Sequence, residues 1–512
     1  MRFAIAIHCA LAAAWAGLAA PTGWAAGERE MFAIQVVDAA TSRGIPLVEL
    51  KTVNDVRYYT DSAGYAAIDD PGLMGRRVFF HVSSHGYEFA ADGFGYRGTK
   101  LDVAPGGEAR LAMRRLNIAE RLYRVTGEGI YRDSQMLGLP APLAQPVVNG
   151  RVAGQDSVQT ALYRGRIFWF WGDTNWLEYP LGHFGMSGAT SRLPGQGGLD
   201  PAEGIDLEYF VNDKGFSRPM CDFPVPGMKW IDGLMVLRDP QGRERLAANY
   251  ARMKSLGEAY ERGLVVYDDE KEGFVHLCDF PLDSMLRPKG QPFRHAADGV
   301  EYFYFPGAYP LVRVRADYAA IQNPAAYEGF TCLAAGSRAG DPQPKVERDA
   351  RGQPVWAYKP GTEPLDEAGQ NALIKAGAIA PGDAWLRMRD ADSGREIRIH
   401  HGSVAYNAYR GRWIMIATES GGESSFLGEI WYAEAEAPEG PWPLGRKIVT
   451  HDQYSFYNPA HHTFFDQDGG RIVYFQGTYT MMFSRKADPT PRYDYNQIMY
   501  RLDLSDPRLR MD

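Results

Sequence analysis

Apolar and polar residues alternate along most of the chain with the period of two that is typical of β-strands. Between residues 30 and 115, short alternating stretches such as MFAIQVVDA and RRVFFHVSS are separated by turn residues, which predicts a small β-sandwich domain. We interpret residues 116–144 as a linker. From residue 145 onward, five further segments each open with polar residues that lead into an apolar strand. Helical periodicity is weak outside DEAGQNALIKAGAI, for which we predict a short helix.

One repeat within the larger region can be aligned directly. The stretch QDSVQTALYRGRIFWFWGDT lies over HGSVAYNAYRGRWIMIATES, so that Ser157 matches Ser403 and Asp173 matches Glu419. Repeated four-stranded units of this size are typical of propeller blades. We therefore expect an all-β protein, in which a five-bladed β-propeller at residues 145–512 follows the small β-sandwich domain.

The chain begins like an exported protein. Residues 1–25 combine the basic Arg2, an apolar stretch and small residues before Ala26, which predicts a signal peptide and a secreted or periplasmic location. No later run is long and apolar enough to insert in a membrane. Cys221, Cys278 and Cys332 lie beyond this segment and allow at most one internal disulfide, so the fold must depend on its core.

Composition narrows the class of partner. The 63 acidic and 55 basic residues leave a net charge of −8, which argues against nucleic acid or an anionic membrane surface. A neutral or weakly charged substrate fits better. Aromatic residues make up 12% of the chain, which sheet packing explains most simply and which sugar-stacking surfaces also require. There is no G-x-S-x-G elbow, phosphate loop or dinucleotide motif, and the oligomeric state is left open.

Two aspartates stand at the open end of a predicted hairpin. If its turn centres on Arg164–Gly165, antiparallel pairing places Asp156 directly opposite Asp173. Opposed residues hold their Cβ atoms about 4.5–5.5 Å apart. Two carboxylates at that distance retain one proton between them, which separates their pKa values as acid–base catalysis requires. A β-bulge would shift this register by one residue.

The residues that open the first strand of each propeller blade converge on one end of the central axis. We predict that they form a substrate-binding funnel with the following members: Gln155, Asp232, His295, His401, Ser403, Asn458, His461, His462 and Trp176. A further catalytic carboxylate is expected from Glu419 or Glu261. Adjacent histidines on a strand point to opposite faces and cannot chelate as a pair, so no metal ligands are assigned. No cofactor is required, and a single structural divalent ion such as calcium is left open.

These stretches carry family resemblances. GQDSVQ…FWGDTNW is similar to the opening of the glycoside hydrolase family 183 (endo-D-arabinanase-like) propellers, which implies that Asp156 and Asp173 carry the chemistry. EIWYAEAEAPEGPW resembles a blade ending of five-bladed family 43 furanosidases, which draw one acid from each of three blades; that arrangement maps onto Asp156, Asp232 and a glutamate. GIPLVELKT…YYTDSAGYAAI resembles the transthyretin-like, carboxypeptidase regulatory-like module, which implies a structural or docking role.

The resemblances imply a glycoside hydrolase that acts on a poly- or oligosaccharide with paired carboxyl groups. Sugar, linkage, endo or exo action, and retention or inversion are left open. One alternative is a polysaccharide lyase propeller, in which His and Tyr perform β-elimination on a uronate and the funnel is basic. The other is a non-catalytic carbohydrate-binding propeller, whose carboxylates only accept hydrogen bonds from sugar hydroxyls.

Overall fold

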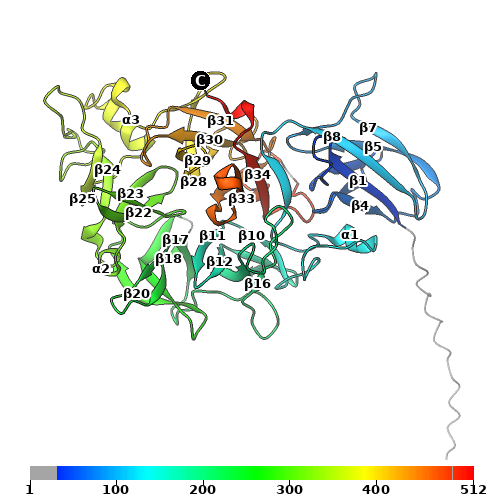
Figure 1. The fold of residues 1–512 in the computed structure, drawn as a ribbon, viewed down its shortest axis with the longest axis horizontal. Helices are drawn as coiled ribbons and strands as arrows, with labels where there is room; N and C mark the ends of the chain where they lie inside the picture. The colour runs from blue at the N-terminus through cyan, green and yellow to red at the C-terminus, as the bar shows by residue number, and fades with distance from the viewer. Residues whose placement is uncertain (1–30, 184, 256, 487, 512) are drawn as a thin grey trace, which may run out of the picture.

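The computed structural model describes residues 31–183, 185–255, 257–486 and 488–511, and their strands build an all-β protein (Figure 1). The predicted signal peptide lies outside these residues. The described helices are short: α1 (Arg132–Met136), α2 (Tyr318–Ile321), α3 (Glu367–Lys375), and the 3-10 turns η1 (Pro324–Ala326), η2 (Pro381–Asp383), η3 (Thr463–Phe465), η4 (Asp468–Gly470) and η5 (Pro507–Leu509). Over the part of the chain that is described, no helix has the length and apolar character needed to span a membrane.

The N-terminal region consists of two four-stranded sheets. One has the order β4 (Tyr65–Ile68), β1 (Phe32–Asp38), β8 (Glu108–Arg115) and β6 (Tyr87–Glu88). The other has the order β3 (Arg57–Tyr59), β2 (Glu49–Thr52), β5 (Arg76–Ser83) and β7 (Gly98–Val103). Ile34 and Val36 of the first sheet and Leu50 and Phe80 of the second belong to one buried cluster, so the two sheets enclose a single core.

The larger region contains five main sheets in its described residues. In most of them, strands that are neighbours in the sheet are also consecutive in the chain, as in up-and-down units. The first has β11 (Gln159–Tyr163), β12 (Arg166–Trp171), β15 (Ser187–Arg192) and β16 (Glu208–Tyr209). The second has β17 (Met228–Arg238), β18 (Glu244–Ser255), β19 (Glu258–Asp268) and β20 (Gly273–Phe280). The third has β21 (Phe293–Ala297), β22 (Val300–Pro306), β23 (Pro310–Arg315), β24 (Glu328–Thr331) and β25 (Ala357–Pro360).

The fourth and fifth sheets depart from this simple order. The fourth has β28 (Ile399–Asn407), β29 (Arg412–Glu419), β30 (Ile430–Ala435), β31 (Leu444–Val449), β26 (Met388–Asp390) and β27 (Glu396–Ile397). The fifth has β32 (Ser455–His461), β33 (Ile472–Thr480), β34 (Asn496–Asp503) and β9 (Glu120–Arg124). A small sheet of β10 (Val152–Gln155), β13 (Thr174–Trp176) and β14 (Tyr179–His183) extends the first hairpin.

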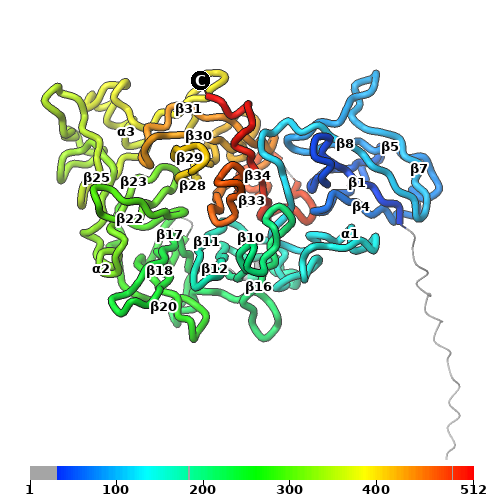
Figure 2. The backbone as a smooth tube through the Cα atoms, viewed as in Figure 1, coloured from blue at the N-terminus to red at the C-terminus, as the bar shows by residue number. Residues whose placement is uncertain are grey.

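Residues 116–144, which we interpreted as a linker, contribute structure to both parts of the protein. Strand β9 pairs with β34, bringing Arg124 opposite Ile498 near the end of the chain, where the two segments lie side by side in Figure 2. Asp61 of the N-terminal region accepts a 2.7 Å hydrogen bond from the backbone of Ser134 in α1. The segment therefore fixes the start of the larger region to its last sheet.

Successive sheets bury their faces against one another. Phe170 and Ile231 join the first and second sheets in one buried cluster, and equivalent clusters join each later pair. Trp169 of β12 and Tyr474 of β33 share a further cluster, so the last sheet also packs against the first. The predicted helix is confirmed as α3, with Asp366 as its N-cap accepting a 2.8 Å hydrogen bond from Gly369.

Candidate functional site

The predicted register of the first hairpin is confirmed. Gln159 pairs with Phe170 and Tyr163 with Arg166, on either side of a two-residue turn at Arg164 and Gly165. Both turn residues have positive φ, 49° and 74°, as a type I′ hairpin turn requires. The same register continues beyond the hairpin, because Gln155 of β10 pairs with Thr174 of β13. Asp156 and Asp173 lie between these two paired segments and are therefore held beside each other.

The backbone at this point is irregular. Ser157 adopts a φ of 53°, and the amide of Gly172 donates a 2.7 Å hydrogen bond to the carbonyl of Asp156. The Asp156 carboxyl group lies directly over Gly172, where an added Cβ would come within 2.2 Å of Oδ1. A residue larger than glycine at 172 would displace the carboxyl group.

Asp156 is a half-buried carboxyl group surrounded by hydroxyl donors. Tyr457 donates a 2.9 Å hydrogen bond and Ser157 a 3.2 Å hydrogen bond to Oδ2, and the Tyr495 hydroxyl supplies another. Burial, together with the negative charge of Asp173, raises the pKa of Asp156 to about 6, although these hydrogen bonds act in the opposite direction. The group therefore titrates close to neutral pH.

Asp173 is oriented through one of its oxygens. Its Oδ1 accepts 2.9 Å hydrogen bonds from the indole of Trp230 and from the amide of Gly185. Burial raises the pKa of Asp173, and the two hydrogen bonds lower it. Because Trp230 lies on the first strand of the second sheet, this contact ties the first hairpin to the next sheet along the chain.

Asp232 lies two residues beyond Trp230, at a break in the pairing of β17 with β18. Its Oδ1 accepts hydrogen bonds from the amides of Gly233 at 2.9 Å and Gly290 at 2.7 Å. Burial raises the pKa of Asp232 to about 6, against the opposing effect of Lys289 and Arg287. Asp232 is thus a second half-buried aspartate that gains its proton near neutral pH.

Lys289 connects this aspartate with the third and fourth sheets. The electrostatic interactions of its ammonium group reach Asp232, Asp366 and His401. Burial, with smaller contributions from His400 and Lys289, lowers the pKa of His401 to about 4, so its imidazole is neutral at physiological pH. The side chain of Gln291 donates a 2.7 Å hydrogen bond to the carbonyl of Val158. Residues that begin the first strands of four sheets therefore meet around one centre.

Glu367 was missed at the level of sequence; it follows Asp366, whose carboxyl group interacts with Lys289. It is the first residue of α3, and its Oε1 accepts 3.4 Å hydrogen bonds from the Tyr309 hydroxyl and from the amide of Ile399, the first residue of β28. Burial raises the pKa of Glu367 to about 7. In the sequence this residue resembles an ordinary acid in the first turn of a helix, where the helix dipole favours negative charge. Only its burial against Tyr309 distinguishes it.

Two of the predicted binding residues are enclosed between strands. Gln155 is completely buried, donating to Thr174 and Ser187 and accepting from Tyr209, so no face is left for a substrate. Ser403 is buried as well, where its Oγ accepts a hydrogen bond from the amide of His461. These side chains join strands rather than line a funnel.

His461, the last residue of β32, and His462, which follows it, point into separate buried environments. His461 lies 2.8 Å from Asp466 through its Nε2, and His462 is enclosed between Trp169 and Phe464. Burial lowers the pKa of His462 to about 3. Asn458, by contrast, reaches the centre, because its Nδ2 donates a 2.9 Å hydrogen bond to Ser157.

His295 and Trp176 lie elsewhere than predicted. His295 contacts the ring of Trp413 at 5.0 Å, in a hollow between the third and fourth sheets. Trp176 stacks on Phe216 at 4.9 Å, with the ammonium group of Lys214 over its other side.

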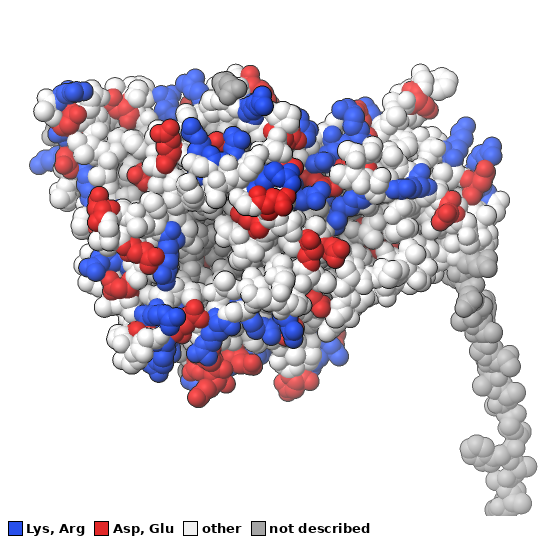
Figure 3. Space-filling view, viewed as in Figure 1, with Lys and Arg blue, Asp and Glu red and all other residues white. Residues whose placement is uncertain are grey.

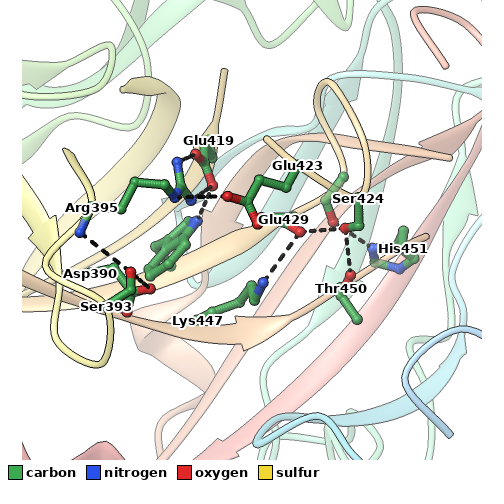
Figure 4. Close-up of polar contacts among 12 residues, drawn as sticks. Asp390, Ser393, Arg395, Glu419, Glu423, Ser424, Glu429, Lys447, Thr450 and His451 are labelled. Atoms are coloured by element: carbon green, nitrogen blue, oxygen red, sulfur yellow. Dashed lines mark hydrogen bonds and ion pairs between the residues drawn. The ribbon is translucent and has the colours of Figure 1, made fainter. Parts of the chain in front are cut away.

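The two predicted glutamates are engaged in ion pairs. Glu261 lies on β19, the third strand of its sheet, and is held at 3.0 Å by Arg252. Glu419 is 1% exposed and accepts hydrogen bonds from Arg395 at 2.5 Å and from the indole of Trp431 at 2.9 Å (Figure 4). Arg395 reaches it from the hairpin turn between β26 and β27.

Glu429 lies beside Glu419 in the same buried group (Figure 4). Glu429 accepts hydrogen bonds from Ser424 and, at 3.3 Å, from Lys447. Burial and the adjacent Glu429 raise the pKa of Glu419, which Arg395 opposes. Two carboxyl groups and two cations thus balance one another inside the fourth sheet. Within the described ranges, no group of three or more His, Cys, Asp or Glu side chains is arranged to hold a metal ion.

Comparison with known proteins gives fold likenesses alone. No protein-family model matches the chain, and no curated protein matches it. Among solved structures, it is similar to a presumed hydrolase from Bacteroides ovatus, with a TM-score of 0.40 and 12% identity over 68% of this chain and 86% of that one. It is also similar to the exo-β-1,3-galactanase from Phanerochaete chrysosporium, with a TM-score of 0.36 and 8% identity over 77% and 66% of the two chains. The GH43_1 enzyme from Xanthomonas citri, complexed with xylotriose, has a TM-score of 0.30 and 13% identity over 68% and 86%. Likenesses at this level assign neither family nor activity.

Proposed function

We propose that this protein is a glycoside hydrolase whose central site combines Asp156, Asp232 and Glu367. The observation that carries the proposal is that these three half-buried carboxyl groups have pKa values raised to about 6, about 6 and about 7. Carboxyl groups that titrate near neutrality are what glycosidic acid–base chemistry requires. The interactions of Lys289 with Asp232 and with Asp366, next to Glu367, support their convergence.

Each group has a distinct proposed role. Glu367, protonated below its pKa of about 7, gives its proton to the glycosidic oxygen as the bond from that oxygen to the anomeric carbon breaks. Asp156, ionised above about 6 and held by Tyr457, acts as base or nucleophile toward the anomeric centre. Asp232 adds negative charge beside the oxocarbenium-like transition state. Water finally supplies a hydroxyl group to the anomeric carbon. Its proton goes to Glu367 if Asp156 has acted as nucleophile; if Asp156 has acted as base, the proton goes to Asp156 and exchange with solvent restores Glu367.

Asp173 takes a supporting part in this proposal. Its charge raises the pKa of Asp156, and its Oδ1 is already occupied by Trp230 and Gly185. Asn458 and His401 are proposed to contact the substrate, since the first donates to Ser157 beside Asp156 and the second lies near Lys289. Glu419 and Glu261 have no catalytic role in this scheme.

We propose also that the five sheets are blades of a closed five-bladed propeller at residues 145–512. The cluster that joins Trp169 with Tyr474, and the pairing of β9 with β34, support closure between the last and the first sheet. The relationship of residues 30–115 to carboxypeptidase regulatory-like modules, and export guided by residues 1–25, are proposals that rest on the sequence. The relationship to glycoside hydrolase family 183 is likewise a proposal that rests on the sequence.

The substrate is proposed to be a neutral or weakly charged glycan. On the face shown in Figure 3, Lys and Arg side chains are interspersed with Asp and Glu, and no continuous basic field covers that face. A lyase acting on uronates needs cations to bind its substrate. The mixed surface supports a neutral or weakly charged substrate.

A panel of glycans incubated with the purified protein tests this function. New reducing ends with no ultraviolet-absorbing product identify a hydrolase, whereas an absorbing unsaturated product identifies a lyase. Binding without new ends identifies a carbohydrate-binding protein. The variants Glu367→Gln and Asp156→Asn should each abolish new ends on an accepted glycan, while Glu261→Gln should keep them.

A further inference from the structure

A second hollow, of about 960 Å³, lies between the third and fourth sheets. Its volume falls within the range of small-molecule binding sites. Aromatic and basic side chains of both sheets form its walls, among them Arg294, His295, Trp356, Tyr358, Tyr406 and Trp413. None of them takes part in the proposed hydrolysis.

The hollow opens at the opposite end of the first strands from the central site. Ala297, the last residue of β21, and Tyr406, near the end of β28, line it. The residues of the central site lie instead at or before the beginnings of first strands: Asp156 precedes β11, and His401 is the third residue of β28. A ligand in this hollow would therefore not compete with a substrate at Asp156.

The aromatic walls are held in fixed orientations. Trp356 stacks on Phe330 with ring centroids 5.8 Å apart, and its indole donates a 3.2 Å hydrogen bond to the carbonyl of Asp383. Tyr406 packs edge-on against Trp413 at 5.7 Å and keeps 56% of its surface exposed. Rings that are already ordered lose little conformational entropy on binding.

The charges that line the hollow are largely paired with neighbours. Arg294 contacts Glu301 at 3.0 Å, Arg313 contacts Glu328 at 2.6 Å, and Glu436 contacts Arg412 at 3.8 Å. His295 packs against Trp413 and Tyr304 and adds a group that can hydrogen-bond. The hollow thus offers apolar ring faces and polar edges, and its positive and negative charges are mixed.

We propose that this hollow is a second, non-catalytic binding site for a neutral glycan. The C–H faces of a sugar ring can lie on Trp356 and Tyr406, while its hydroxyl groups reach His295 and the polar rim. A polyanion would lack free cations here, and a wholly apolar ligand would leave the polar rim unsatisfied. The proposal does not depend on hydrolysis at Asp156, because the two sites share no residue.

Affinity electrophoresis tests the proposal on the whole protein, with arabinoxylan, β-1,3-galactan or polygalacturonate in the gel. We expect at least one of the two neutral polymers to retard the wild type. The double variant Trp356→Ala/Tyr406→Ala should bind that polymer about tenfold more weakly, since two stacked rings contribute on the order of 1–3 kcal/mol together. The matched control Trp356→Phe/Tyr406→Phe keeps both rings and should remain retarded.

Two further measurements separate this site from the central one. Asp156→Asn should lose hydrolysis and keep retardation. The double alanine variant should keep hydrolysis of a short aryl glycoside, which shows that it is folded although the packing of Trp356 on Phe330 is lost. The proposal is overturned if the double alanine variant is retarded like the wild type, if neither neutral polymer retards the protein, or if polygalacturonate is bound more tightly. If the wild type and all variants fail to hydrolyse any glycan while the wild type is still retarded, the proposed hydrolase function is contradicted and the second binding site is not.

Discussion

Tyr457, on the first strand of the fifth sheet, donates a 2.9 Å hydrogen bond to Asp156, beside the first strand of the first sheet. The contact joins residues far apart in the sequence and stabilises the ionised form of a carboxyl group whose burial favours the protonated form. The position of Asp156 therefore depends on how the end of the chain meets the start of the larger region.

Replacing this tyrosine should move the pH dependence of catalysis. In Tyr457→Phe the hydrogen bond to Asp156 is lost, so the pKa of Asp156 rises. As the pH decreases, Asp156 then becomes protonated, and ceases to act as a base, at a higher pH than in the wild type. We expect the acid limb of kcat/KM against pH to shift upward, with a lower maximum. Tyr474→Phe, which removes a hydroxyl group bound to Gln467, serves as the control and should leave the limb in place. An unshifted acid limb in Tyr457→Phe would show that Asp156 does not act as the ionised group.

The wild-type profile should be bell-shaped with limbs near pH 6 and 7. Activity falls as the pH decreases through about 6, because Asp156 and Asp232 take up protons. It falls as the pH increases through about 7, because Glu367 loses the proton that the leaving group needs. Glu367→Gln should lower kcat by about 10²–10⁴-fold and abolish the alkaline limb. Glu396→Gln, on neighbouring β27, is the matched control; the charge of Glu396 raises the pKa of Glu367, so in this variant the alkaline limb should shift slightly to lower pH and persist. An alkaline limb that persists in Glu367→Gln would assign the acid to another residue.

Gly172 should tolerate no side chain. In Gly172→Ala the new Cβ would meet Oδ1 of Asp156 at 2.2 Å, so the carboxyl group must move away from Tyr457. We expect a loss of turnover of at least about tenfold, since a displacement of about 1 Å in a catalytic group is costly. Gly340→Ala, where an added Cβ meets nothing within 4 Å, controls for the substitution itself. Full activity in Gly172→Ala would contradict the placement of Asp156.

The ion pair of Arg395 with Glu419 should matter for stability and not for catalysis. Arg395→Met leaves a buried carboxylate without its main cation, and urea unfolding should show a loss of about 2–4 kcal/mol. Arg387→Met breaks the 3.7 Å pair with Glu396 and an exposed hydrogen bond to the carbonyl of Pro381, and should cost less than about 1 kcal/mol. Glu419→Gln should retain the kcat of the wild type. A fall of 100-fold or more in that variant, with folding intact, would restore Glu419 as a catalytic candidate.

Local pairing could be predicted from the sequence, whereas side-chain direction and long-range contacts could not. The turn at Arg164–Gly165 determines the partners of Gln159 and Tyr163, so the adjacency of Asp156 and Asp173 follows from counting. The same counting does not show that Gln155 points into a buried network while Asp156 points toward Tyr457.

Repeat alignment was misleading at Glu419. The position matches Asp173, but the hairpin of β26 and β27 brings Arg395 over it, and the described residues of the first sheet include no equivalent hairpin. Glu367 belongs to no blade motif; it is buried only because α3 packs beside Tyr309 and Ile399. Such contacts between distant segments leave no local pattern in one sequence.

The most direct measurement of the central claim is the turnover of Asp156→Asn and Asp232→Asn on a glycan that the wild type cleaves. Both substitutions preserve shape and remove a charge from the proposed site. The account predicts that each lowers kcat/KM by at least about 10³-fold while the thermal midpoint stays within a few degrees of the wild type. Wild-type turnover in both variants would contradict it.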